Sequence, residues 1–447
     1  MCAMLLADVQ RLFQSIKDRY KYNFNLKVKQ MEVLLSILER KDTLAVLPTG
    51  YGKTECFVLP ALMLEEMTGS NHIVLVVSPL KVLMKDIVAR LKERDISAAC
   101  ILKDDEMEVD VKEGLKKGVF SVVLASPEIM LDSHWRDILK NEAYRSRLCL
   151  ICCDEAHCIQ EWGQSFRPCY KEVGVLRSIH RAPLLIRTAT VTKKMKKFIL
   201  DVFEMDFINT IAVYPDRPNI FLHFKKVSHT QTVMEENLQC VKDDFSIDPL
   251  HYKKTIIYCR SISDAANVYE FFASVLPSEL RRSAVQLFHG SLDTCTADFI
   301  LSAFKGDTLR ILVSTIAFGM GVSVENIEQV VHWGASKSVL SYWQEVGRGG
   351  RSGQRCEAYL YATGKSLGDK RRTEEDMRDM CVKIDNGACV RLSVLHELGL
   401  PEMDETYLQK MENRTGCESR KKCEICNCPL CTCCSQCMLK CPCQKKD

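Results

Sequence analysis

The chain has 447 residues, of which 47% are hydrophobic and 27% are charged, and its formal net charge at pH 7 is +3. This length exceeds what a single hydrophobic core supports and predicts two or three domains. The nearly balanced charge excludes a uniformly basic chain, so any nucleic-acid site has to be a local patch. No apolar run approaches the roughly 20 residues of a membrane span, and the first residues lack the basic segment of a signal peptide. We therefore expect an intracellular protein with no membrane partner, whose 24 cysteines are thiols or metal ligands rather than disulfides.

A helical pattern comes first. Apolar residues at Met31, Leu34, Leu35 and Leu38 predict an amphipathic helix, which Gln30 opens. Taken alone, Gln30 reads as an ordinary surface amide.

A glycine loop, LPTGYGKT, occupies residues 47–54 between a strand-like apolar run and a helix-like one. This is the context of a phosphate-binding loop. Its glycines let the backbone turn with the amides toward phosphate oxygens, its lysine would reach the β- and γ-phosphates, and its threonine would hold Mg²⁺. These residues are Gly50, Gly52, Lys53 and Thr54. Leu47 stands where the full G-x-x-x-x-G-K-[ST] pattern has its first glycine, so an ordinary glycine turn is the alternative.

Strand-like runs follow the loop at residues 73–79, 121–127, 148–157 and 183–190. Helix-like segments separate them, which predicts repeated β-α units and a mostly parallel sheet. Ligands gather at the carboxyl ends of the strands in such sheets. The third run delivers Asp154, which would hold Mg²⁺ through its water shell, and Glu155, which would orient an attacking water. A surface turn after a strand is the alternative.

A second β-α series follows a proline-containing joint at residues 214–220. Its strand-like runs cover residues 255–261, 284–290, 309–315, 327–334 and 356–362. It has no phosphate loop of its own, which indicates a duplicated fold that keeps one nucleotide at the interface. In QEVGRGGRSG, Arg348 and Arg351 lie three apart and could face one anion. A catalytic arginine of this kind is worth about 10³ to 10⁵ in rate, and a basic surface turn is the alternative.

Ten cysteines fall between Cys417 and Cys443 and mark a separate module. The CEIC pair has a spacing that suits tetrahedral zinc, for which thiolates are soft ligands. Cys431, Cys434, Cys437 and Cys441 before Pro442 also match the C-x₂-C-x₂-C-x₃-C-P spacing of an iron–sulfur run. Because cysteine is so dense here, we favour a second zinc or a loose metal-binding tail over a cluster. Unliganded thiols in a disordered tail are the remaining alternative.

In this order the motifs resemble those of superfamily 2 helicases. DEAHCIQEWGQSFRPCY (154–170) closely resembles the aromatic-rich loop of RecQ-type DNA helicases. SPLKVLMKD, ASPEIM, TAT, DRPNI, TIIYCRS, STIAFGMGV and QEVGRGGRSG resemble other motifs of that family. The resemblance covers about residues 26–362 and implies an α/β fold of two RecA-like parallel-sheet motor domains with a small C-terminal helical zinc-binding module. The expected boundaries are residues 1–212, 213–364 and 365–447.

The resemblance also implies roles for individual residues. Lys27 and Gln30 would lie at the adenine, and the glycine loop and the acidic pair would have the roles described above. Arg351 would be the arginine finger, with Gln344 and Arg348 beside it.

The resemblance further implies a DNA-sensing loop and a zinc site. The loop would contain Trp162, Phe166 and Arg167, whose flat groups suit the stacking of bases; a place in the core is the alternative for the two aromatic rings. The zinc ligands would be Cys389, Cys417, Cys423 and Cys426, with substitution by Cys428 or Cys431 left open.

The implied function is that of an ATP-dependent helicase that moves 3′ to 5′ on single-stranded DNA and separates duplex. ATP, Mg²⁺ and Zn²⁺ would be its cofactors, and single-stranded and forked DNA and DNA repair or recombination proteins its partners, in the nucleus of a eukaryote or otherwise in the cytoplasm. The chain stops at Asp447, where strongly unwinding relatives continue into a winged-helix domain, so a short form with weak unwinding is expected.

Two departures from the family pattern bear on coupling. Gln164-Ser165 stands in place of the usual His-Asp, and Ser323-Val324 follows STIAFGMGV where the family usually continues with an acid or Asn and then Lys. Both should leave ATP binding intact and put its coupling to DNA in doubt. An RNA helicase and a nucleic-acid-binding scaffold with an uncoupled motor are therefore the alternative functions.

Overall fold

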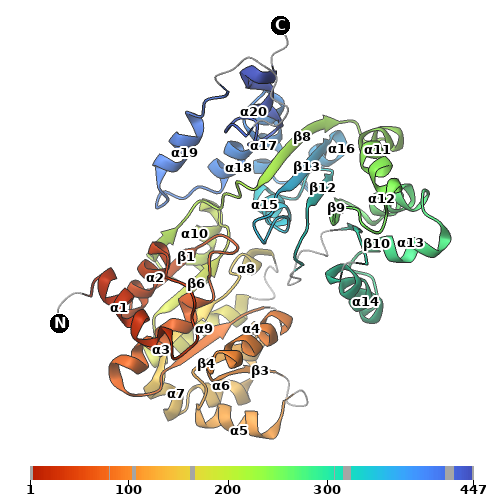
Figure 1. Ribbon diagram of the computed structural model, residues 1–447. Helices are drawn as coiled ribbons and strands as arrows, with labels where there is room; N and C mark the ends of the chain where they lie inside the picture. Colours follow the sequence, from red (N-terminus) through yellow and green to blue (C-terminus); the bar gives the residue numbers. More distant parts are fainter. Residues whose placement is uncertain are drawn as a thin grey trace. The chain divides into compact units, whose positions relative to one another are not determined.

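The computed structural model describes residues 4–79, 81–102, 107–161, 167–306, 308–315, 324–417 and 427–444 (Figure 1). The chain forms two compact units. The first contains Met1–Pro215 and Gly399–Asp404, and the second contains Asp216–Leu398 and Glu405–Asp447. Within the described ranges, no helix has the length and apolar character needed to cross a bilayer.

The first unit is built on a seven-stranded sheet in the order β3-β4-β2-β5-β6-β1-β7, and its strands pair in parallel. The strands are β1 (Thr43–Val46), β2 (Ile73–Val77), β3 (Ala98–Ile101), β4 (Val122–Ala125), β5 (Leu148–Cys153), β6 (Leu184–Thr188) and β7 (Asn209–Ala212). All residues of the first six strands are buried, because the helices that connect parallel strands cover the faces of the sheet. The strand-like runs predicted here correspond to β2, β4, β5 and β6.

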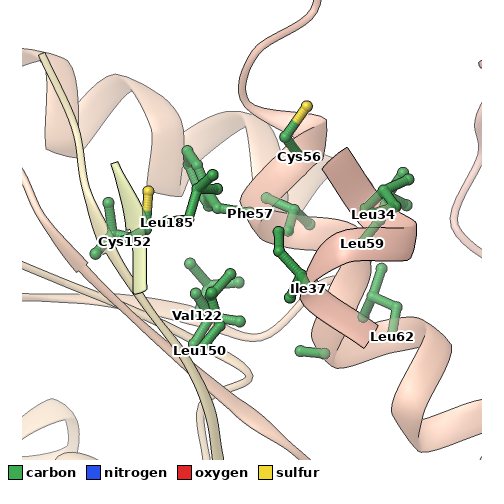
Figure 2. Packing of buried hydrophobic residues seen from close by; sticks show 14 of the residues in the cluster. Leu34, Ile37, Cys56, Phe57, Leu59, Leu62, Val122, Leu150, Cys152 and Leu185 are labelled. Carbon is green, nitrogen blue, oxygen red and sulfur yellow. The ribbon is translucent and has the colours of Figure 1, made fainter. Parts of the chain in front are cut away.

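The helices of this unit are α1 (Leu6–Lys17), α2 (Val28–Leu38), α3 (Glu55–Thr68), α4 (Lys81–Glu93), α5 (Val109–Lys117), η2 (Pro127–Leu131), α6 (Ser133–Leu139), α7 (Glu142–Arg147), α8 (Cys158–Glu161), α9 (Arg167–His180) and α10 (Lys193–Val202). Helix α3 packs on β2 and β5, and α1 and α2 pack on α3. Figure 2 shows the contact: Leu59 and Leu62 of α3 and Leu34 and Ile37 of α2 lie in one buried cluster with side chains of the strands. The glycine loop is therefore fixed at both ends, by β1 and by a helix buried in the core.

The second unit has a six-stranded parallel sheet in the order β10-β11-β9-β12-β13-β8. Its strands are β8 (Ile220–Val227), β9 (Thr255–Cys259), β10 (Val285–Phe288), β11 (Ile311–Ser314), β12 (Gln329–Trp333) and β13 (Cys356–Thr363). Helices α11 (Gln231–Ile247), α12 (Ile262–Ala273), α13 (Ser278–Ala284), α14 (Thr294–Lys305), α15 (Val339–Val346) and α16 (Gly364–Gly368) lie between or after the strands. Two parallel-sheet domains confirm the α/β class and the RecA-like architecture expected from the motifs.

The C-terminal segment consists of α17 (Glu375–Asp385), α18 (Val390–Glu397), α19 (Glu405–Glu412), α20 (Ser435–Lys440) and η5 (Pro442–Gln444). Helices α17, α18 and α20 pack against β8, and Cys434 forms an isolated bridge to Leu222 of that strand. The Phe224 amide also donates a hydrogen bond to Ser435 Oγ at 3.2 Å. The segment predicted as a third domain from residue 365 thus lies within the second compact unit, apart from Gly399–Asp404.

Candidate nucleotide site and thiol sites

The glycine loop of residues 47–54 leaves the carboxyl end of β1 and enters α3. Gly50 and Gly52 have φ of 78° and 85°, the left-handed region that favours glycine. The Leu47 amide donates to the Thr188 carbonyl at 3.1 Å, which ties the start of the loop to the end of β6. Thr54 is the N-cap residue of α3, so the loop ends at a helix N-terminus, where backbone amides can bind an anion.

Gln30 is 2% exposed and lies against this loop. Its Nε2 donates to the Gly52 carbonyl at 2.9 Å, and its Oε1 accepts from the Lys27 amide at 2.8 Å. A Cβ on Gly52 would come within 2.6 Å of Gln30 Nε2, so only glycine allows this contact. The Lys27 ammonium lies 4.3 Å from the centre of the Tyr51 ring. The structure therefore brings both predicted adenine residues to the phosphate-type loop, and it shows that Gln30 is no surface amide.

Asp154 follows β5 and is fully buried. Arg187 of β6 forms a bidentate ion pair with Asp154. Its Nε donates to Asp154 Oδ1 at 2.6 Å, and its Nη2 donates to Asp154 Oδ2. Arg187 is 3% exposed, and its guanidinium stacks 4.9 Å from the centre of the Phe57 ring. Burial is the largest single influence and lowers the pKa of Arg187, but the charge and hydrogen bonds of Asp154 together with other nearby groups raise the pKa above its ordinary value. The acidic residue proposed to hold Mg²⁺ thus lies in a buried ion pair with Arg187.

Glu155 has a φ of 47°, an uncommon conformation for a residue other than glycine. Strain of this kind persists where the surroundings impose it, and it gathers at functional sites. The Glu155 amide donates to Asp154 Oδ1 at 2.7 Å, and Glu155 Oε2 lies 3.3 Å from His157 Nδ1. His157 Nδ1 also lies 3.3 Å from Thr188 Oγ1. The acidic pair is therefore tied to the end of β6, which is paired with β1 and its loop.

Arg187 is a residue of this site that the sequence did not single out, whereas Thr188 belongs to the TAT motif. The available signal was an arginine inside the otherwise apolar run PLLIRTAT, since a charge in a buried strand requires a partner.

In the second unit, Gln344 lies in α15 and the loop after that helix carries Arg348, which is 7% exposed, and the half-buried Arg351. The backbone of this loop is held by the start of the unit. Arg217 donates to the carbonyls of Gly347, Gly349 and Gly350 at 3.2, 2.9 and 2.6 Å. Asn219 donates to the carbonyls of Gly350 and Gln354 at 2.9 and 2.8 Å. The DRPNI motif thus fixes the loop that presents the two arginines.

Four thiols gather where α18 and α20 begin. Cys389, Cys433, Cys434 and Cys437 have sulfurs that all lie within 4.8 Å of one another. Cys389 Sγ is 3.6 Å from Cys433 Sγ and 3.8 Å from Cys434 Sγ. Two thiolates on one tetrahedral zinc stand about 3.8 Å apart when the Zn–S bonds are about 2.3 Å. The donor set therefore fits a metal ion that prefers thiolates. We call this group the Cys389 site.

The ligand prediction is only partly reflected in this group. Cys389 lies in it, but Cys417 lies in a different group with Cys428 and Cys441, and Cys423 and Cys426 fall outside the described residues. The iron–sulfur pattern is divided as well, because Cys434 and Cys437 belong to the Cys389 site whereas Cys431 and Cys441 share another group. Spacing alone did not indicate this group, because the fold brings Cys389, the N-cap residue of α18, to the N-terminus of α20.

The remaining predicted residues are placed as follows. Trp162, Phe166, Gln164, Ser165 and Ser323 lie outside the described residues. Arg167 begins α9, and Val324 is 2% exposed.

Comparison with known proteins identifies the class. The DEAD/DEAH box helicase family matches residues 27–198, and the helicase conserved C-terminal domain matches residues 230–353. The first region contains β1 to β6 with the glycine loop and the acidic pair, and the second contains β9 to β12. The chain therefore belongs to the helicases that combine these two domains.

Within that class, the resemblance to RecQ-type helicases is confirmed. The ATP-dependent DNA helicase RecQ of Pasteurella multocida is 32% identical over 337 residues, which are 74% of this chain and 49% of that protein. RecQ of Bacillus subtilis is 31% identical over 354 residues, or 78% of this chain and 55% of that protein. A putative ATP-dependent RNA helicase of Acanthamoeba polyphaga mimivirus is 28% identical and covers 80% of this chain and 61% of that protein. The chain spans about half the length of the RecQ relatives.

Solved structures show the same fold. The DUF1998 helicase MrfA bound to DNA and AMPPNP matches with a TM-score of 0.64 at 16% identity, covering 91% of this chain and 55% of that one. The DEAD-box helicase Mss116 bound to ssRNA matches with a TM-score of 0.61 at 19% identity, covering 84% of this chain and 78% of that one.

Proposed function

We propose that the chain is an ATP-dependent DNA helicase that hydrolyses ATP to move 3′ to 5′ along single-stranded DNA and to separate duplex. The observation that carries the proposal is the meeting of the glycine loop, Asp154 and Glu155 at the carboxyl edge of β1, β6 and β5. That arrangement supplies a phosphate cradle and two carboxylates in one place, which is what phosphoryl transfer needs. The choice of DNA is supported by the RecQ relatives.

Each residue has a defined task in this proposal. Lys53 offsets charge on the β- and γ-phosphates, and Thr54 and Asp154 hold Mg²⁺, which neutralises the phosphate oxygens when bound. Each carboxylate oxygen of Asp154 can accept more than one hydrogen bond, so the ion pair with Arg187 leaves capacity for a metal-bound water. Glu155 orients the attacking water, and Gln30 selects the base.

Further residues act on the transition state and on DNA. Arg351, with Gln344 and Arg348 beside it, stabilises the charge that develops on the transferred phosphoryl group. The Trp162 to Arg167 segment contacts the bases of single-stranded DNA, where aromatic stacking contributes about 1–3 kcal/mol per base. The Cys389 site binds Zn²⁺, which holds α18 and α20 together. DNA repair or recombination proteins as partners, and a nuclear place in a eukaryote, remain predictions.

An RNA helicase is the second candidate, favoured by the mimivirus relative named as a putative RNA helicase. One experiment separates the candidates. ATP hydrolysis is measured with no nucleic acid, with single-stranded DNA and with single-stranded RNA of the same sequence, and strand displacement is then measured on 3′-tailed, 5′-tailed and blunt duplexes. We expect stimulation by DNA and displacement from the 3′ tail. Stimulation by RNA alone would establish the second candidate, and binding without stimulated hydrolysis would establish an uncoupled scaffold.

A further inference from the structure

A second group of thiols lies apart from the Cys389 site. Its members are Cys417, Cys428, Cys431, Cys441 and Cys443, and we call it the Cys441 cluster. Within it, Cys417 and Cys428 form one triplet with Cys441, and Cys431 and Cys443 form another with the same Cys441. In each triplet the three sulfurs lie within 4.8 Å of one another. Cys441 is therefore the sulfur common to both.

The spacing of these sulfurs matches metal thiolates better than disulfides. Cys441 Sγ lies 3.6 Å from Cys428 Sγ and 3.3 Å from Cys443 Sγ, and Cys431 Sγ lies 3.4 Å from Cys443 Sγ. A disulfide requires about 2.05 Å, whereas thiolates on one tetrahedral zinc stand about 3.8 Å apart.

The interior of this segment consists mainly of sulfur. Cys441, Cys443 and Cys431 are 0%, 3% and 7% exposed, and they are the buried members of their own core cluster. The partly buried side chains packed on them are Cys417, Cys428, Leu430 and Met438. A core with so little aliphatic area cannot offset the conformational entropy of ordering the chain, so small modules of this kind depend on a metal or on cross-links.

The backbone is shaped to bring Cys417 to the cluster. A Cβ on Gly416 would come within 2.5 Å of Pro442 Cδ and 3.2 Å of Cys441 Sγ. Glycine is therefore required for the segment before Cys417 to lie against the Cys441-Pro442 turn. The Cys431 amide also donates to Cys428 Sγ at 3.4 Å.

We propose that the Cys441 cluster is a second metal site, which binds Zn²⁺ through Cys441 and its neighbouring thiolates. The bound ion would hold the C-terminal segment in its folded conformation. On binding, each ligating thiol releases its proton to solvent and donates a sulfur lone pair to the ion, and nothing is oxidised or reduced. Zinc fits because it prefers sulfur and tetrahedral geometry. A four-cysteine iron–sulfur site does not fit, because the C-x₂-C-x₂-C-x₃-C run is divided between the two sites.

The test is the zinc content of the full chain purified with a reductant. Wild-type protein should carry about two equivalents, and Cys441→Ser should lose at least one. Cys434→Ser tests the Cys389 site separately, so failure of one site is distinguishable from failure of the other. Cys240→Ser is the matched control, since Cys240 is an exposed cysteine of the same unit. An unchanged zinc content in Cys441→Ser would overturn the proposal.

A second measurement applies if Cys441→Ser does not fold. Wild-type protein is treated with a thiol-alkylating reagent before and after a chelator, and the modified cysteines are mapped by mass spectrometry. Protection of Cys431, Cys441 and Cys443 that the chelator abolishes supports the site. Equal alkylation in both samples, or a disulfide that joins two of these cysteines in the purified chain, would refute it.

Discussion

Arg391 Nη1 donates to Asp216 Oδ1 at 2.6 Å, and the two side chains are 1% and 3% exposed. The same guanidinium donates to the carbonyls of Arg217, Ile220 and Cys433. Asp216 Oδ2 in turn accepts from the Tyr407 hydroxyl at 2.6 Å. The buried ion pair and the Tyr407 hydrogen bond thus connect α18 and α19 to the DRPNI motif. Arg217 and Asn219 of that motif hold the loop that carries Arg348 and Arg351.

We predict that Arg391→Met destabilises the second unit by about 3–5 kcal/mol, because it leaves the buried Asp216 carboxylate without its cation. Chemical denaturation followed by fluorescence measures the change. Lys226→Met is the control, since Lys226 and Asp385 form an exposed pair that should contribute less than about 1 kcal/mol. The double variant Asp216→Asn/Arg391→Met should be more stable than Arg391→Met alone. If it is equally unstable, the ion pair is not the reason.

Arg217→Met should slow ATP hydrolysis without weakening ATP binding. It removes three hydrogen bonds to the loop of Gly347 to Gly350, and a displacement of about 1 Å in catalytic groups costs on the order of 100-fold in rate. DNA-stimulated turnover gives kcat, and nucleotide titration gives the affinity. Arg281→Met is the matched control, because Arg281 is an exposed arginine of the same unit that donates to a carbonyl, that of Leu276. Normal kcat in Arg217→Met would contradict the positioning role.

Arg187→Met should destabilise the first unit, again by about 3–5 kcal/mol, because the fully buried Asp154 charge loses its partner. Replacing both partners in Asp154→Asn/Arg187→Met should restore much of that stability but no hydrolysis, since the carboxylate proposed for Mg²⁺ is gone. Thermal unfolding and ATPase assays on the same preparations separate the two effects. Recovery of turnover in the double variant would exclude Asp154 as a metal-binding group.

Lys53→Ala should abolish ATP hydrolysis by removing the positive charge at the transferring phosphoryl group. Glu155→Gln should still bind ATP but not turn it over, because the amide cannot orient and deprotonate the attacking water. Single-turnover hydrolysis and nucleotide binding distinguish the two variants. Lys41→Ala is the control, as Lys41 is an exposed lysine of the same unit that pairs with Glu39. Ordinary turnover in either active-site variant would remove the assignment of the loop and the acidic pair.

Zinc removal at the Cys389 site should lower thermal stability rather than ATP affinity. Cys434→Ser deletes a thiolate at the start of α20, which is packed on β8, and structural zinc sites contribute to folding directly. Acidification should act in the same direction, because protons compete with the metal for thiolates and release it as the pH falls. Zinc content and unfolding temperature are measured together across pH. A variant that keeps its zinc, or one that loses ATP binding first, would argue against this role.

The sequence by itself determined the class of fold and predicted the main parts of the candidate nucleotide site. Buried parallel strands appear in the sequence as mainly apolar runs, and nine of the predicted runs correspond to β2, β4, β5, β6, β9, β10, β11, β12 and β13. The glycine loop and the acidic pair could also be predicted from the sequence, because phosphate and metal binding require particular residue types at short, fixed spacings within each motif. Strand β8 was not predicted, because His223, Lys225 and Lys226 interrupt the apolar pattern of this strand, which lies at the edge of the sheet.

Only the tertiary structure decided which distant residues act together. Arg187 meets Asp154 because β5 and β6 are neighbours in the sheet, and Arg217 reaches the loop of Gly347 to Gly350 across about 130 residues of sequence. The cysteines make the same point. Their spacing allowed several ligand sets, and the packing of α18 and α20 on β8 separated them into the Cys389 site and the Cys441 cluster. Spacing constrains ligands within one loop, whereas contacts between elements depend on how apolar surfaces pack, and short motifs do not encode that packing.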